Sequence, residues 1–70
     1  MISQISLLVN GEPRSLAGPV SVATLLTTLG LDRRKVAVER NEAIVSRSVY
    51  EQTALADGDR LEIVHFIGGG

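Results

Sequence analysis

Hydrophobic and polar residues alternate near the start of the chain, as they do in a strand that buries one face. Ile5, Leu7 and Val9 occupy every second position, and the sequence NGEP follows them. Asn and Gly both tolerate positive φ, so this sequence favours a tight turn. We therefore expect a β-hairpin whose second strand covers about residues 14–17 and ends at a Gly-Pro pair.

A helical period replaces this alternation in the sequence SVATLLTTLGL. Ser21 is placed to cap the first turn, and Gly30 suits the left-handed residue that often ends a helix. Apolar residues at i, i+3, i+4 and i+7 form one face, namely Val22, Leu25, Leu26 and Leu29. A helix of about ten residues is marginal alone, so we expect it to pack on a sheet.

Two further strands are predicted in the sequence KVAVERNEAIVSR, joined by a turn at Asn41-Glu42. The stretch after them is irregular, and we expect Leu55 to anchor it to the core. Tyr50 is expected to be a half-buried ring with its hydroxyl in water. The sequence DGD at residues 57–59 favours a turn into the final strand.

The final strand, RLEIVHFI, has one apolar and one mixed face. The apolar face is formed by Leu61, Ile63, His65 and Ile67. Arg60 and Glu62 mark the other face as the solvent side. Val64 and Phe66 lie on this same face, so they are expected to be exposed. We interpret Val64 and Phe66, together with Ile67, as a partner-binding patch beside the chain end.

This order of elements predicts an α+β domain, in which a mixed sheet of four to five strands packs on one main helix. We expect residues 1–67 to form the domain and residues 68–70 to form a flexible glycine tail. Glycines lack a Cβ, so such a tail can enter a narrow channel in another protein.

Composition argues against several classes of function. Seven basic residues stand against eight acidic ones, which gives no reason to expect a nucleic-acid partner. No apolar stretch approaches the roughly 20 residues of a membrane span, and the start of the chain does not resemble a signal peptide. We therefore expect a cytoplasmic protein without membrane contact.

Candidate catalytic groups are scarce. The chain has no cysteine and one histidine, which argues against disulfides, a zinc site and a nucleophilic triad. His65 is assigned to packing at the strand end. The remaining candidate is the carboxylate of Gly70, which would need activation by another protein, for example by adenylation.

The residues also resemble a known family. The segments SVATLLTTLGL, VAVERNEAIV and LADGDRLEIVHFIGGG are similar to the ThiS family of sulfur carriers in thiamine biosynthesis. Members of that family are ubiquitin-like β-grasp proteins that end in Gly-Gly, and the resemblance covers essentially the whole chain. Asn41-Glu42 replaces the Asn-Gly that is commoner in the family, and Ser46 stands where proline is frequent.

The resemblance implies a carrier and not an enzyme. Gly70 would be adenylated by a ThiF-type adenylyltransferase that uses ATP and magnesium, while the carrier itself would hold no cofactor or metal. A sulfurtransferase or cysteine desulfurase would supply sulfur for a thiocarboxylate, with Gly68 and Gly69 as a slender neck. Thiazole synthase (ThiG) would then take the sulfur into the thiazole ring. We expect the carrier to be a monomer.

Three alternatives stay open at this point. The small subunit of molybdopterin synthase shares the implied fold and the thiocarboxylate. A ubiquitin-like modifier would be ligated to lysines through Gly70. A β-grasp interaction module would bind a partner through its sheet and would carry an inert tail.

Overall fold

The computed structural model describes residues 3–66. The strands in this part are β1 (Ser3–Val9), β2 (Glu12–Gly18), β3 (Val36–Arg40), β4 (Ala43–Val45) and β5 (Arg60–His65). The described residues also form the α-helix α1 (Val22–Thr28) and two short 3-10 helices, η1 (Arg33–Lys35) and η2 (Arg47–Val49). The second strand is longer than predicted, because Pro13 is tolerated on an edge strand.

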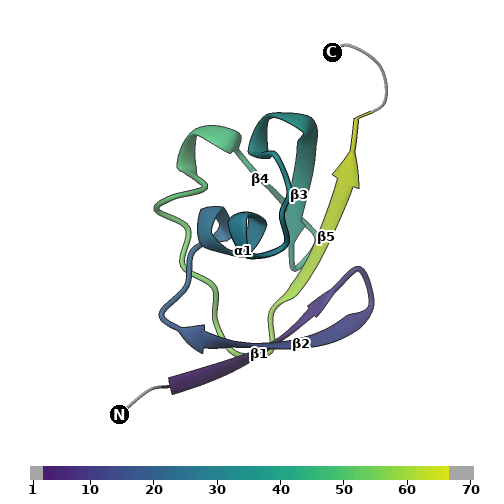
Figure 1. Ribbon diagram of the computed structural model, residues 1–70. Coiled ribbons are helices and arrows are strands. Elements are labelled where there is room, and N and C mark those ends of the chain that lie inside the picture. The colour runs from purple at the N-terminus through teal and green to yellow at the C-terminus, as the bar shows by residue number, and fades with distance from the viewer. Residues whose placement is uncertain (1–2, 67–70) are drawn as a thin grey trace.

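The last strand in the sequence lies at the centre of the sheet. The strand order is β2-β1-β5-β3-β4, so β5 separates the two hairpins. It runs parallel to β1 over two residue pairs and antiparallel to β3 over five. In Figure 1 the sheet curves around α1, and β5 runs beside β3 towards the end of the molecule far from β2. The predicted mixed sheet on one helix is thus confirmed.

The ends of α1 close as the sequence predicts. The Thr24 N–H donates to Ser21 Oγ at 3.1 Å, which caps the first turn. At the other end Gly30 has φ +74°, and the Leu31 N–H donates to the Leu26 carbonyl at 2.9 Å. This is a Schellman cap. The regular helix has seven residues, fewer than the ten or so expected, because the cap takes over the last turn.

The hydrophobic core lies between α1 and the inner face of the sheet. Alternate residues of the three central strands face the helix, and the irregular stretch before β5 adds Leu55, as predicted. The buried aliphatic residues are Leu7, Val9, Val20, Val22, Leu25, Leu26, Val36, Val38, Leu55, Leu61 and Ile63. Each contributes about 1.5–3 kcal/mol by leaving water, which compensates for the absence of disulfides in a chain this short.

Tyr50 is fully buried, so the expectation of a half-buried ring was wrong. The residue is 1% exposed. Its carbonyl accepts the Ala23 N–H at 3.0 Å, which fixes this segment against the start of α1. The guanidinium carbon of Arg33 lies 5.7 Å from the ring centroid, within the range of a cation–π contact. The loop after β4 therefore packs against the start of α1, with Tyr50 as its buried contact.

The two hairpin turns share a left-handed backbone but differ in sequence. Asn10 and Gly11 have φ +50° and +82°, while Asn41 and Glu42 have φ +52° and +73°. Positive φ at both central residues is the geometry of a type I′ turn, for which Asn-Gly is well suited. Glu42 adopts it with a Cβ, which costs about 1–2 kcal/mol. Strain at this turn is the physical consequence of the missing glycine.

We expect Glu42→Gly to raise the free energy of unfolding by about 0.5–1 kcal/mol, because removing the Cβ strain outweighs the added freedom of the unfolded chain. Urea denaturation measures the change. Glu42→Gln is the matched control, since it removes the charge but keeps the Cβ. The Glu42–Arg60 ion pair is long, at 3.9 Å, and exposed, so we expect little change in the control. Equal stabilisation by both variants would contradict the strain argument.

Candidate functional site

The end of β5 carries exposed apolar residues on the outer face of the sheet, away from α1. Val64 pairs with Ala37, and the Phe66 N–H donates to the Lys35 carbonyl at 2.9 Å. Val64 is 61% exposed and Phe66 is 50% exposed. The predicted alternation of faces is confirmed here, because Leu61 and Ile63 are buried on the opposite side. Two large apolar side chains therefore face solvent where the chain leaves the sheet.

The remaining predicted site residues lie outside the described residues. These are Ile67, expected in the partner-binding patch, and Gly68, Gly69 and Gly70, expected in the tail. The structure fixes the point from which they continue, at Phe66 beside Lys35. Their roles stay predictions.

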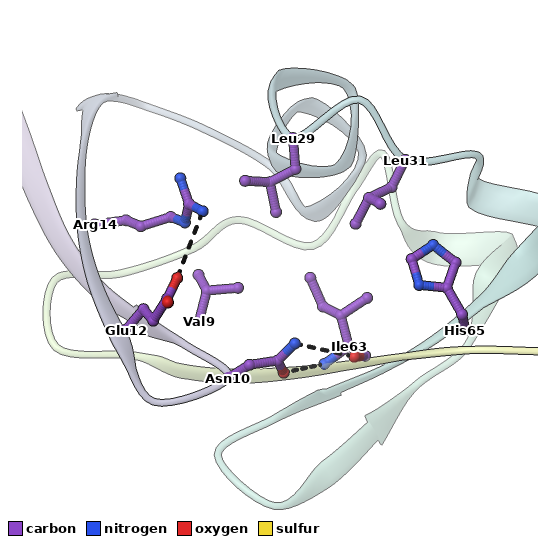
Figure 2. A pocket seen from close by; sticks show the side chains of 8 residues that line it. All are labelled: Val9, Asn10, Glu12, Arg14, Leu29, Leu31, Ile63 and His65. Carbon is purple, nitrogen blue, oxygen red and sulfur yellow. Dashed lines mark hydrogen bonds and ion pairs between the residues drawn. The ribbon is translucent and has the colours of Figure 1, made fainter.

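A groove lies on the helix side of β5, under the end of α1 (Figure 2). It has a volume of about 240 Å³. Its apolar wall is formed by Val9, Leu29, Leu31 and Ile63. Its polar rim is formed by Asn10, Glu12, Arg14 and His65. His65 lies on the predicted face but is exposed at this rim, so its expected role in packing was wrong. Its cross-strand partner Val36 is buried, so the core reaches this pair but the imidazole itself stays at the surface.

Asn10 takes the place of a strand residue beside β5. Its Nδ2 donates to the Ile63 carbonyl at 3.1 Å, and its Oδ1 accepts the Ile63 N–H at 2.8 Å (Figure 2). The Asn10 N–H itself donates to the Leu61 carbonyl at 2.9 Å. One side chain thus extends the β1–β5 pairing by one step after β1 has ended, and it fixes the direction in which β5 continues.

Asp59 organises the entry of β5 into the sheet. It is 6% exposed, although an aspartate usually lies at the surface. Its Oδ2 accepts from Arg40 Nε at 2.7 Å and from the Ala56 N–H at 2.8 Å, and its Oδ1 accepts from Asn41 Nδ2 at 3.0 Å. Asn41 Oδ1 in turn accepts the Arg60 N–H at 2.9 Å. The carboxylate therefore joins the turn after β3, the preceding loop and the start of β5.

The pKa of Asp59 reflects this balance. Burial by itself raises the pKa of the carboxyl, because it removes water from the charged form. The Ala56 N–H, the Asn41 amide and the Arg40 guanidinium outweigh burial and leave the pKa below its ordinary value. Asp59 is therefore charged at neutral pH and bound by its neighbours.

Neither a metal-binding cluster nor a membrane-spanning helix occurs among the side chains and helices of residues 3–66. Residues 3–66 contain no group of three or more His, Cys, Asp or Glu side chains placed to hold a metal ion. In the same part of the chain, no helix is long and apolar enough to cross a membrane. The candidate site is thus the exposed apolar end of β5, and the start of the same strand is held in place by the hydrogen bonds of Asp59.

The ThiS family model matches residues 7–70. The chain belongs to the ThiS family. The sulfur carrier protein ThiS of Bacillus subtilis is 42% identical over 50 residues, which is 71% of this chain and 76% of that protein. The crystal structure of thiamine biosynthesis protein ThiS from Geobacter metallireducens is 35% identical, with a TM-score of 0.80 over 94% of this chain and all of that one. The ubiquitin-like β-grasp fold is thereby confirmed.

Other relatives are much longer than this chain. A thiazole synthase of Paramagnetospirillum magneticum is 56% identical over 66 residues, which is 94% of this chain and 20% of that protein. A thiazole synthase of Magnetococcus marinus is 49% identical over 61 residues, or 87% and 19%. The chain spans about a fifth of the length of these relatives, so each of them contains a ThiS-like region within a larger protein.

Sequence reasoning missed the contacts of Asn10 and Asp59. Both residues were interpreted as turn formers, and both do lie in turns. Their partners are far away in sequence: Ile63 is 53 residues from Asn10, and Arg40 is 19 residues from Asp59. No spacing rule joins positions so distant. The one available signal was the Asn-Gly and Asp-Gly-Asp chemistry, which predicts a turn and gives no information about its partner.

Asp59→Asn should lower the free energy of unfolding by about 2 kcal/mol at pH 7, because it removes the charge that binds Arg40. The folded pKa of Asp59 is lowered, so its stabilisation is present above the unfolded pKa of about 3.9. It is lost as the pH falls through the folded value. The free energy of unfolding of the variant should therefore fall less on acidification than that of the natural chain. Urea denaturation from pH 7 down to pH ~2.5 measures this difference.

Asp57→Asn is the matched control, two residues away in the same turn and exposed. In the natural chain Asp57 Oδ1 accepts the Ser6 N–H at 2.7 Å. The amide oxygen of asparagine can accept the same N–H, so we expect little loss of stability. An equal loss in both variants would show that the turn, and not the buried ion pair, matters.

Proposed function

We propose that this chain is a sulfur carrier of thiamine biosynthesis, and that the sulfur is carried on the carboxylate of Gly70. The observation that carries this proposal is the family match, which extends to Gly70 itself. The sulfur carrier of Bacillus subtilis supports it from sequence, and the thiamine biosynthesis protein of Geobacter metallireducens supports it from structure. On this proposal the protein is a co-substrate of other enzymes.

The chemistry follows from the residue types. The chain has no cysteine, so sulfur cannot be carried as a persulfide on a thiol. A carboxylate must be activated before it can accept a nucleophile. Attack of the Gly70 carboxylate on the α-phosphorus of ATP forms an acyl-adenylate and releases pyrophosphate. Hydrosulfide then attacks the acyl carbon and displaces AMP, which leaves a thiocarboxylate with sulfur in place of one oxygen.

Each of these steps requires another protein. An adenylyltransferase of the ThiF type would bind ATP and magnesium and carry out the first step. A sulfurtransferase or cysteine desulfurase would deliver the sulfur. Thiazole synthase would consume it, and the ThiS-like regions within relatives named thiazole synthase support this partnership. We place the reaction in the cytoplasm and propose that the carrier is a monomer that contacts neither membrane nor nucleic acid.

The tail is tested by intact mass spectrometry. The protein is incubated with the adenylyltransferase of its genome, ATP, magnesium and sodium sulfide. We expect a mass gain equal to the exchange of one oxygen for sulfur, and we expect none when ATP is omitted. A chain without Gly69 and Gly70 should show no gain while its thermal melting stays that of the full chain.

Two results would count against the carrier. Sulfur incorporation by the shortened chain would exclude Gly70 as the acceptor. Failure of the intact chain, together with normal binding of the adenylyltransferase, would favour an interaction module with an inert tail. Transfer of sulfur to a molybdopterin precursor and not to thiazole synthase would favour the molybdopterin synthase subunit.

The exposed strand end is tested separately. We expect Val64→Asp and Phe66→Asp each to weaken binding of the adenylyltransferase by about tenfold, since each places a charge in an apolar contact. Calorimetry measures the affinity, and thermal melting checks the fold. Val49→Asp is the control, because Val49 is 40% exposed but lies in η2, outside the sheet. Equal affinity of all three variants would remove Val64 and Phe66 from the interface.

A further inference from the structure

The chain contains a single lysine, Lys35, and its other basic side chains are all arginines. A guanidinium stays protonated in proteins and does not act as a nucleophile, whereas a lysine amine can attack an activated carbonyl carbon. The chain has no cysteine, so no thiol competes for such a carbon. Lys35 therefore carries the only side-chain amine that an activated carboxyl group of this chain could meet.

Lys35 lies beside the point at which β5 leaves the sheet. Its carbonyl accepts the Phe66 N–H at 2.9 Å, and the next residue, Val36, pairs with His65. Lys35 is exposed, and its ammonium group makes no ion pair within residues 3–66. The amine is thus accessible at the base of the glycine tail, and no carboxylate of the described residues binds it.

The length of the tail determines when the amine can meet Gly70. Four residues follow Phe66, and a chain of four residues spans at most about 14 Å. A tail that is threaded straight into a partner would carry Gly70 away from Lys35. Three of the four residues are glycines, which accept both signs of φ, so the sequence permits the chain to reverse. A reversed tail brings the carboxyl group within reach of the four-carbon side chain of Lys35.

The α-amino group at the start of the chain is not a comparable acceptor. β1 and β5 run parallel, and Leu8 pairs with Arg60. Ser3 begins β1 five residues before Leu8, whereas Phe66 comes six residues after Arg60. The start of β1 and the end of β5 therefore lie at opposite ends of the sheet (Figure 1), farther apart than four residues can span.

We propose that the amine of Lys35 captures the activated carboxyl group of Gly70 in the same chain when no sulfur is supplied. The inference rests on the proposed function, which provides the acyl-adenylate. Lys35 Nζ attacks the acyl carbon and forms a C–N bond, and the C–O bond to the phosphate breaks. AMP leaves with the electron pair, and the nitrogen gives a proton to water. The product is an internal isopeptide, which has lost one water relative to the free acid.

Capture within one chain is favoured over capture between chains. A short linker between two reacting groups gives an effective concentration in the millimolar range. At about 10 µM carrier, this concentration exceeds that of Lys35 on other copies by about a hundredfold. We therefore expect a cyclic monomer and not a covalent dimer. Because hydrosulfide and Lys35 attack the same carbon, this reaction would withdraw activated carrier when sulfur is scarce.

The test incubates the full chain with the adenylyltransferase, ATP and magnesium but without sulfide. We expect the intact mass of the natural chain to fall by one water and that of Lys35→Arg to stay unchanged. A protease that cleaves after lysine should cut the untreated chain once and leave the cyclic product uncut, because its lysine is acylated. With sulfide present, both proteins should instead exchange one oxygen for sulfur, since the carrier reaction does not use the amine.

The matched control exchanges two residues and so keeps composition and net charge. In the double variant Lys35→Gln with Gln4→Lys, the single lysine lies near the start of β1, at the far end of the sheet from Phe66. Gln4 is exposed, and its side chain bonds only Ser15 within residues 3–66, so the fold should be retained, as thermal melting checks. We expect this variant to lose no water.

The outcomes separate this inference from the proposed function. Equal loss of water in the double variant would overturn the inference, because the position of the amine would then not matter. A covalent dimer, or a link to the adenylyltransferase in place of the cyclic monomer, would also overturn it. If the natural chain takes up sulfur but loses no water when sulfide is omitted, this inference alone fails. If the natural chain neither releases pyrophosphate nor takes up sulfur, the proposed function fails and this inference fails with it.

Discussion

The Asp59 carboxylate is the contact on which the placement of β5 depends. It holds Arg40, Asn41 and the Ala56 N–H at the point where the chain turns into its last strand. That strand must enter between β1 and β3, which belong to separate hairpins. A buried charge with hydrogen bonds from several segments specifies one position for the turn, because any shift would leave the charge unpaired.

The central position of β5 in turn determines what its end can do. Pairing with β3 extends to His65, and the Phe66 N–H then donates to Lys35 of η1. The pairing with β1 ends early and is continued by the Asn10 side chain. Near its end, β5 is therefore paired with β3 on one side, while its pairing with β1 on the other side has already ended. This supports a role in which the sheet fixes the direction of the following residues and a partner receives them.

The outer face illustrates how a small domain can keep features that reduce its own stability. The cross-strand Glu39–Glu62 pair of β3 and β5 and the left-handed Glu42 each oppose folding, and the exposed Ile44 contributes little hydrophobic stabilisation. The free energy contributed by the buried aliphatic core and by the capped helix α1 offsets these costs. Residues that lower the stability of a fold are often found at functional surfaces. In this domain they lie on the outer face of the sheet and in the turn between β3 and β4.

The sequence alone determined the elements and their faces. Alternation in the strands, the Ser21 cap, the Gly30 stop and the parity of Val64 and Phe66 were all predicted, because each depends on neighbours within a few residues. Tertiary structure decided the rest: the burial of Tyr50, the exposure of His65 and the contacts of Asn10 and Asp59. Ile63 lies 53 positions from Asn10, and Arg40 and Asn41 lie 19 and 18 positions from Asp59, so local periodicity contains no information about these contacts.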